Sequence, residues 1–166
     1  MAYILEADIG ELITPEDFER QKHKWQQYLQ YLESVRHQMP KSAHEFASAS
    51  WHYDTADSRS LHDSWVDSLV IREPSKGTRH EIRSVEIEVR LFGPYHNGNT
   101  TLRYEGVHAY SLQGAVFHTR DGHGDWLCDE IRFTEHHVVH EVEFESDARW
   151  TIECQDITWT WQPLSN

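Results

Sequence analysis

The chain has few cysteines, no long apolar run and fewer basic than acidic residues, and each shortage excludes a class of protein. Its two cysteines are Cys128 and Cys154. Small secreted domains stabilised by disulfides carry more, and no C-x-x-C spacing indicates a zinc site. No stretch approaches the roughly 20 apolar residues that span a bilayer, and the N-terminus lacks the basic and apolar regions of a signal peptide. The sequence therefore predicts a cytoplasmic protein without membrane contact.

The charge balance narrows the choice of partners. The chain has 15 Lys and Arg against 28 Asp and Glu, a net charge of −13. A protein with this charge repels phosphate backbones, so no nucleic-acid partner is expected. The same field would attract a basic protein, or serve only to keep the chain in solution.

Helical signals occupy residues 14–50. Thr14 is typical of an N-cap, Pro15 suits the first helical position, and Pro40 stops the pattern. Between them apolar residues recur at helical spacing: Phe18, Trp25, Tyr28, Leu29, Leu32, Val35 and Met39. We predict an amphipathic helix over 14–39 and a short second helix over 42–50.

Residues 61–162 change to strand-like alternation. The clearest case is 85–91, in which apolar residues at odd positions alternate with charged ones, as expected for a strand with one buried face. Residues 74–77 read as the end of a strand centred on Leu69. The apolar phase shifts near Gly106 and again near Gln155, which predicts a β-bulge or bend at each place.

These signals predict a single domain over 1–166 of the α+β class. No helix-sized gap separates the strands, which favours an antiparallel meander over βαβ units. We therefore expect a twisted antiparallel sheet of six to seven strands with the N-terminal helix packed on one face.

Thirteen histidines are the most unusual feature of the composition. His136 and His140 are the candidates for a metal site. On a strand they would share a face but lie roughly 13 Å apart, too far for one ion without a bend. The spacing matches no zinc motif, so the expectation is surface or half-buried histidines and no cofactor.

No motif identifies catalytic residues. His62, Asp63 and Ser64 are the residue types of a hydrolase triad, but sequence neighbours on a strand point to opposite faces. Asp129 and Glu130 diverge in the same way. An alternative remains a small-molecule or metal-binding enzyme with a pocket between helix and sheet, lined by His62, Asp63, Trp126 and Asp129.

Acidity is concentrated toward the C-terminus. Residues 121–157 contain eleven acidic and two basic side chains. Glu141, Glu143 and Glu153 lie on strands expected to pair, where they could form a negative face for a basic protein partner. A solvated sheet face is the plainer interpretation.

Residues 61–112 contain short motifs, His62-Asp63-Ser64 and Tyr104-Glu105-Gly106-Val107. In these the chain resembles a loose group of small bacterial α+β domains, mostly uncharacterised, some of which look like immunity proteins of polymorphic toxin systems. The resemblance implies a fold and supplies no catalytic residues. Together with the charge, it gives the expectation of a non-enzymatic bacterial interaction domain, immunity-like, that inhibits a basic protein by binding it. The oligomeric state is left open.

Overall fold

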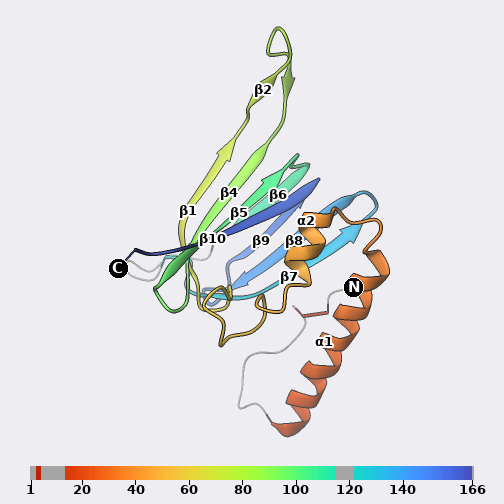
Figure 1. The fold of residues 1–166 in the computed structure, drawn as a ribbon, viewed down its shortest axis with the longest axis vertical. Helices are drawn as coiled ribbons and strands as arrows, with labels where there is room; N and C mark the ends of the chain where they lie inside the picture. The colour runs from red at the N-terminus through yellow and green to blue at the C-terminus, as the bar shows by residue number, and fades with distance from the viewer. Residues whose placement is uncertain (1–2, 5–13, 115–121, 166) are drawn as a thin grey trace.

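The computed structural model describes residues 3–4, 14–114 and 122–165, which form two helices and ten strands (Figure 1). The helices are α1 (Pro15–Val35) and α2 (Lys41–Ala47). The strands are β1 (Trp65–Arg72), β2 (Ser75–Lys76), β3 (Ile82–Arg83), β4 (Glu86–Phe92), β5 (Gly98–Glu105), β6 (Ala109–Gln113), β7 (Trp126–Thr134), β8 (His137–Phe144), β9 (Arg149–Cys154) and β10 (Asp156–Pro163). Neither described helix combines the length and apolarity needed to cross a bilayer.

The strands form three antiparallel sheets, so the expectation of one sheet with six to seven strands is wrong. Sheet I has the order β1-β4-β5-β10, sheet II has the order β6-β9-β8-β7, and β2 pairs only with β3. Alternation reveals which face of a strand is buried, but not which sheet the strand joins. The α+β class and the antiparallel pairing are confirmed.

Two chain segments bend from one sheet into the other. After β5 the chain turns at Gly106, whose φ of 58° lies in the left-handed region, and continues as β6. The second segment turns at Gln155, between β9 and β10. The backbone amide of Gln155 donates to both Glu105 O and Gly106 O, at 2.9 and 3.2 Å. The predicted irregularities at Gly106 and Gln155 are thus the corner that folds sheet I over sheet II.

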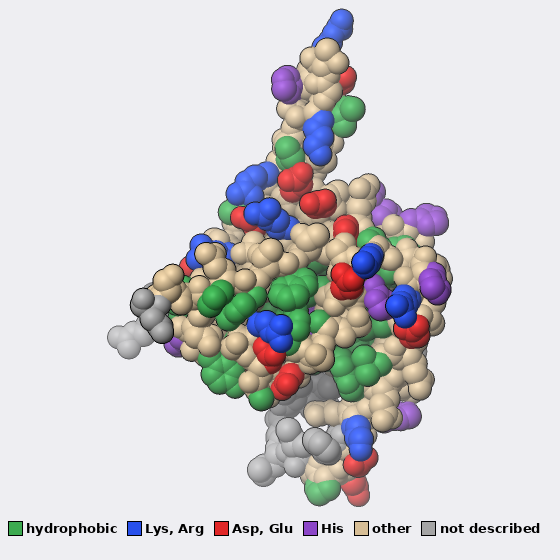
Figure 2. All heavy atoms as spheres, in the orientation of Figure 1, with side chains coloured by type: hydrophobic (Ala, Val, Ile, Leu, Met, Phe, Trp, Pro, Cys, Tyr) green, Lys and Arg blue, Asp and Glu red, His purple; other side chains and the backbone are tan. Residues whose placement is uncertain are grey.

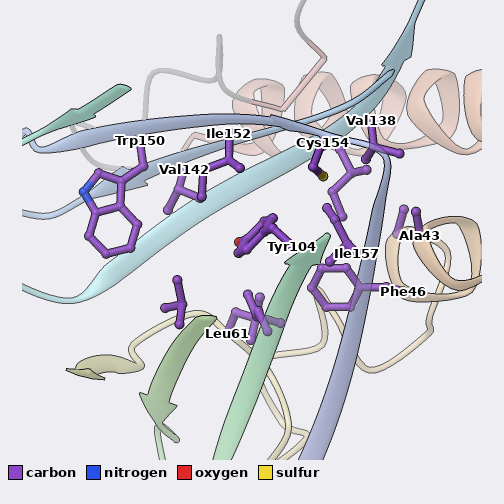
Figure 3. Packing of buried hydrophobic residues seen from close by; sticks show 14 of the residues in the cluster. Ala43, Phe46, Leu61, Tyr104, Val138, Val142, Trp150, Ile152, Cys154 and Ile157 are labelled. Atoms are coloured by element: carbon purple, nitrogen blue, oxygen red, sulfur yellow. The ribbon is translucent and has the colours of Figure 1, made fainter. Parts of the chain in front are cut away.

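The core lies between the two sheets (Figure 3). Sheet I contributes the apolar side of β4, as the 85–91 alternation predicts, with Leu102, Tyr104 and Ile157. Sheet II contributes Trp126, Val142, Phe144, Trp150 and others, while α2 inserts Ala43 and Phe46 at one side. Full burial of each such side chain stabilises the fold by about 1.5–3 kcal/mol.

Helix α1 ends at Val35, before the Met39 limit predicted from spacing, and a turn carries the chain to α2. It attaches at the edge of sheet II through tyrosine hydroxyls. The Tyr28 hydroxyl accepts from Ile131 N (3.0 Å) and donates to Ile131 O (2.9 Å). Tyr31 does the same with Phe133, and Tyr53 donates to Asp129 O. These hydroxyls complete the outer edge of β7, where a further strand would otherwise pair.

Candidate functional site

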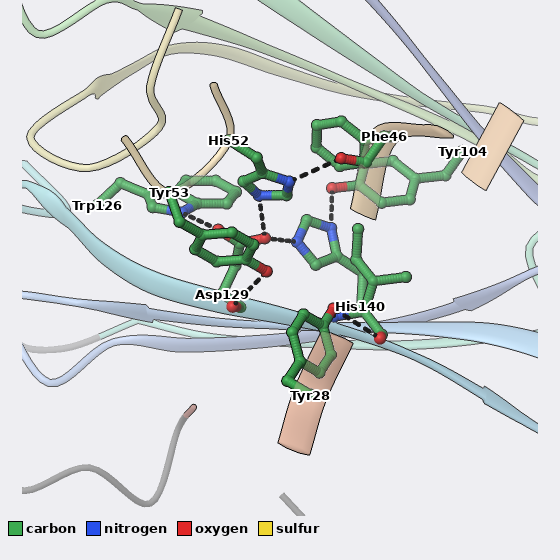
Figure 4. Close-up of polar contacts among 9 residues, drawn as sticks. Tyr28, Phe46, His52, Tyr53, Tyr104, Trp126, Asp129 and His140 are labelled. Atoms are coloured by element: carbon green, nitrogen blue, oxygen red, sulfur yellow. Dashed lines mark hydrogen bonds and ion pairs between the residues drawn. The ribbon is translucent and has the colours of Figure 1, made fainter. Parts of the chain in front are cut away.

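The largest group of buried polar side chains surrounds Asp129 at the centre of the molecule (Figure 4). Trp126 and Asp129 come from β7, His140 from β8 and Tyr104 from β5, while His52 follows α2. The group therefore joins both sheets to the helical segment.

Three donors converge on the Asp129 carboxylate. His52 Nε2 lies 2.8 Å and His140 Nε2 lies 2.9 Å from Oδ2, and Trp126 Nε1 donates to Oδ1 at 3.1 Å. The side chains of Asp129 and both histidines are at most 3% exposed. A carboxylate so removed from water needs such donors, because its desolvation costs several kcal/mol.

The remaining partners assign the protons. His52 Nδ1 lies 3.0 Å from Phe46 O, and a carbonyl oxygen only accepts, so both nitrogens of His52 donate and its ring is an imidazolium. His140 Nδ1 lies 2.8 Å from the Tyr104 hydroxyl. The buried Tyr104 hydroxyl has this ring nitrogen as its hydrogen-bond partner and donates to it, so His140 Nδ1 accepts and His140 Nε2 donates to Asp129. Every polar hydrogen on the side chains of His52, His140, Tyr104 and Trp126 then has an acceptor.

The pKa of Asp129 agrees with an ionised carboxylate. Burial alone would raise that pKa, but the adjacent His52 and His140 and the hydrogen bonds from both rings hold it well below its usual range. Burial, with smaller contributions from Cys154 and Asp129, raises the pKa of Tyr104 well above its usual value. Asp129 is therefore ionised and Tyr104 keeps its proton.

The surrounding core side chains separate this cluster from solvent. A catalytic acid or base has to come within hydrogen-bond reach of a substrate, and these side chains have almost no exposed surface. Two cavities of about 340 Å³ each lie elsewhere, one on the outer face of sheet I around Glu88 and the other around Met39 and His44. Of the cluster residues only Tyr104 borders one of these cavities, the one on sheet I, and its side chain is fully buried. The cluster is therefore a buried network that links both sheets to the helical segment.

The four residues of the enzyme hypothesis are divided between interior and surface. Trp126 and Asp129 lie in the cluster. His62 and Asp63 precede β1 at the surface, where their side chains are 40% and 59% exposed and lie 2.9 Å apart. The Asp63 amide donates to Trp126 O, but the side chains share neither cavity.

The histidines predicted as metal candidates are also separated. His140 is buried beside Asp129, whereas His136 lies in the turn before β8. Among the described residues, no three His, Cys, Asp or Glu side chains are grouped so that they could hold an ion. Sequence reasoning missed His52 and Tyr104, which lie 77 and 25 positions from Asp129 in the numbering. No spacing rule connects them.

Glu141, Glu143 and Glu153 lie on the outer face of sheet II, as the strand pattern predicts. Two of them have basic partners: Arg132 contacts Glu141, and Arg149 lies 2.8 Å from Glu143. The negative charge of this face is thus partly neutralised.

A more strongly acidic surface lies at one end of this face, and we call it the acidic rim: Asp63, Asp125, Glu145 and Asp147. Backbone hydrogen bonds connect its segments, from Asp63 N to Trp126 O and from Glu145 N to Asp125 O, each 2.9 Å. Within the described part of the chain, Asp125, Glu145 and Asp147 form no ion pair, and the Asp63 carboxylate pairs with His62 and with no Lys or Arg. Four carboxylates are therefore held together with little compensation.

Comparison with models of known protein families gives no match for this chain. No curated protein matches it either. Only the chain's own residues therefore indicate its function.

Proposed function

We propose that this chain is a non-enzymatic interaction domain that binds a basic protein through the acidic rim and the adjacent outer face of sheet II. The observation that carries the proposal is the rim itself, in which Asp63, Asp125, Glu145 and Asp147 gather at the surface without a described Lys or Arg partner.

The acidic surface is rigidly supported. Phe144 and Trp150, which flank the rim's β8–β9 turn, are fully buried. Gathering like charges at one surface is destabilising through their mutual repulsion, and a basic partner offsets that repulsion. Preorganised charge of this kind accelerates association by electrostatic steering.

The resemblance to immunity-like bacterial domains fits the same proposal. An immunity protein neutralises an enzyme by covering its site, which requires a complementary surface and no chemistry. A basic toxin or nuclease in the cytoplasm is the class of partner that the charge would favour.

The proposal is tested with two charge-reversed variants of equal net charge. Immobilised wild type, E145K/E153K and E19K/E45K are exposed to a bacterial lysate at low salt and eluted by a salt step. The second pair lies on exposed positions of the helices. Wild type and E19K/E45K should retain the same basic protein, and E145K/E153K should lose it.

Retention of that protein at equal strength by all three columns would contradict the proposed surface. A captured partner also permits a rate measurement, in which the association rate constant of wild type should fall steeply as ionic strength rises.

A further inference from the structure

Residues 73–85 form an arm that stands clear of the body between β1 and β4 (Figure 1). Its strands are two residues long, with Ser75 paired to Arg83 and Lys76 to Ile82. Nearly all its side chains are exposed. A two-stranded hairpin is only marginally stable alone in water, so a surface packed against it would stabilise the arm.

The arm has the opposite charge to the rest of the molecule. Lys76, Arg79 and Arg83 outnumber Glu73 and Glu81, which gives residues 73–85 a net charge of +1 and leaves −14 for the remainder. The Glu81 carboxylate accepts a hydrogen bond from Arg79 N within the turn. Figure 2 shows Lys and Arg side chains along the arm and at its tip.

Strand β1, which leads into the arm, is an outer strand of sheet I and pairs only with β4 among the described strands. Large apolar side chains are exposed along β1 and the arm: Trp65 at 47%, Ile71 at 41% and Ile82 at 59%. An unpaired edge with exposed apolar side chains is a site at which another strand can add.

The acidic rim adjoins the opposite end of β1. Asp63 N donates to Trp126 O, and Trp126 N donates to Ser64 O, immediately before β1 begins. The eight residues of β1 span about 26 Å at ~3.3 Å per residue. One edge strand thus has an acidic surface at its start and a basic arm at its end.

We propose that two copies of this chain pair antiparallel through β1, so that the arm of each copy lies against the acidic rim of the other. Asp63 and Gly77 are equally distant from Val70 in the sequence, as are Ser64 and Lys76. Pairing about Val70 therefore brings arm and rim together at both ends of a two-fold interface. The bulge between Val66 and Ser68 restricts regular strand pairing to Ser68–Arg72. This inference is separate from the proposed function: in the dimer the arm of the second copy occupies the acidic rim, and a foreign basic partner would have to displace it.

Sedimentation velocity of the purified full chain tests the proposal at about 150 mM salt, which screens repulsion between the bodies beyond roughly 8 Å. The average mass of wild type should rise with concentration from one 19.6 kDa chain toward two. K76E/R79E/R83E should raise the dimer dissociation constant about tenfold or more, because acid then opposes acid. K22E/R36E/K41E is the control: it has the same net charge as K76E/R79E/R83E, but its substitutions lie outside the arm. It should dimerise like wild type.

A charge swap identifies the surface that the arm contacts. D125K/E145K alone should also weaken the dimer, since its rim keeps Asp63 and Asp147 but has no net negative charge to attract the basic arm. Mixed with K76E/R79E/R83E, it should form a heterodimer, because its basic arm meets an intact acidic rim and the acidic arm meets a rim that no longer repels it. Replacement of residues 75–83 by Asn-Gly, between Pro74 and Ser84 whose backbones are already hydrogen-bonded, removes the arm. This variant should remain folded, by its thermal midpoint, and be monomeric.

Wild type that stays monomeric at all concentrations would overturn the proposal, as would a dimer that survives removal of the arm. A mixture of the swapped variants that fails to associate would overturn the arm–rim contact. A monomer whose arm binds a DNA duplex or polyglutamate instead would show a different occupant and overturn it as well.

Discussion

At the scale of single residues, the fold depends on how Asp129 is compensated. The carboxylate is buried with one imidazolium, one neutral imidazole and one indole as donors. Removing one member of a buried ion pair leaves the other without compensation, which is more costly than losing a neutral hydrogen bond. The members of this cluster should therefore differ in how much their loss destabilises the protein.

Asp129→Asn should lower the free energy of unfolding by about 3–5 kcal/mol, because His52 loses its counter-charge. Tyr104→Phe removes only the hydroxyl that donates to His140 and should cost about 1–3 kcal/mol. Urea unfolding followed by tryptophan fluorescence measures both. Equal destabilisation by the two variants would contradict the assigned protons.

The same carboxylate gives a pH dependence. Its pKa is lower in the folded than in the unfolded chain, so its stabilising contribution is present above the unfolded value of about 4 and is lost as the pH falls below it. Urea midpoints of wild type and Asp129→Asn should therefore converge between about pH 4 and pH 2. A difference that stays constant over that range would exclude Asp129 as the titrating group.

The sequence predicts how adjacent residues are oriented, but not which distant residues surround Asp129. That Asp129 and Glu130 point to opposite faces follows from strand geometry, and Glu130 indeed faces Arg132 and the amides of Tyr3 and Ile4. The partners of Asp129 come from other segments, and their positions depend on how the sheets pack. His52 lies beyond the short helix predicted over 42–50, in a segment for which the sequence predicted no element.

At the scale of elements, local patterns carried more information. The helical spacing of α1, the alternation of β4 and the phase shift at Gly106 all follow from side-chain direction along one element. The arm was misinterpreted because Pro74 and Gly77 read as the end of a strand, whereas the chain resumes pairing at Ser75. Sheet membership depends on pairing between distant strands and was also missed.

The tyrosines at the edge of β7 give a prediction for an element. Tyr28→Phe leaves the buried Ile131 N–H and C=O without their partner and should cost about 1–3 kcal/mol. Native-state hydrogen exchange of the Ile131 amide should accelerate in parallel. Tyr110→Phe, at a half-exposed position on β6, is the matched control and should change neither quantity.

At the scale of the whole molecule, an acidic body carries one basic extension. The body is closed by two sheets and by the cluster between them, whereas the arm depends on its own few backbone hydrogen bonds. Among the described elements, local stability should therefore be lowest in the arm.

Among the Lys and Arg sites of the described residues, limited trypsin digestion of a dilute sample should cut first after Lys76, Arg79 or Arg83. The two fragments should remain associated through β1 and β4. Mass spectrometry under native and denaturing conditions distinguishes the nicked body from separated fragments. Initial cleavage after Arg90 or Arg103, within paired strands, would contradict this order of stability.

The cluster around Asp129 also has a consequence for how the chain folds. Its members are supplied by segments near residues 52, 104, 126 and 140, so the ion pair and its hydrogen bonds form only after both sheets and the α2 region have come together. Until then, any collapsed intermediate that buries Asp129 carries an uncompensated charge. The buried Asp129 carboxylate raises the free energy of such partly folded states. Folding should therefore be more cooperative, and slower, than formation of the short hairpins alone.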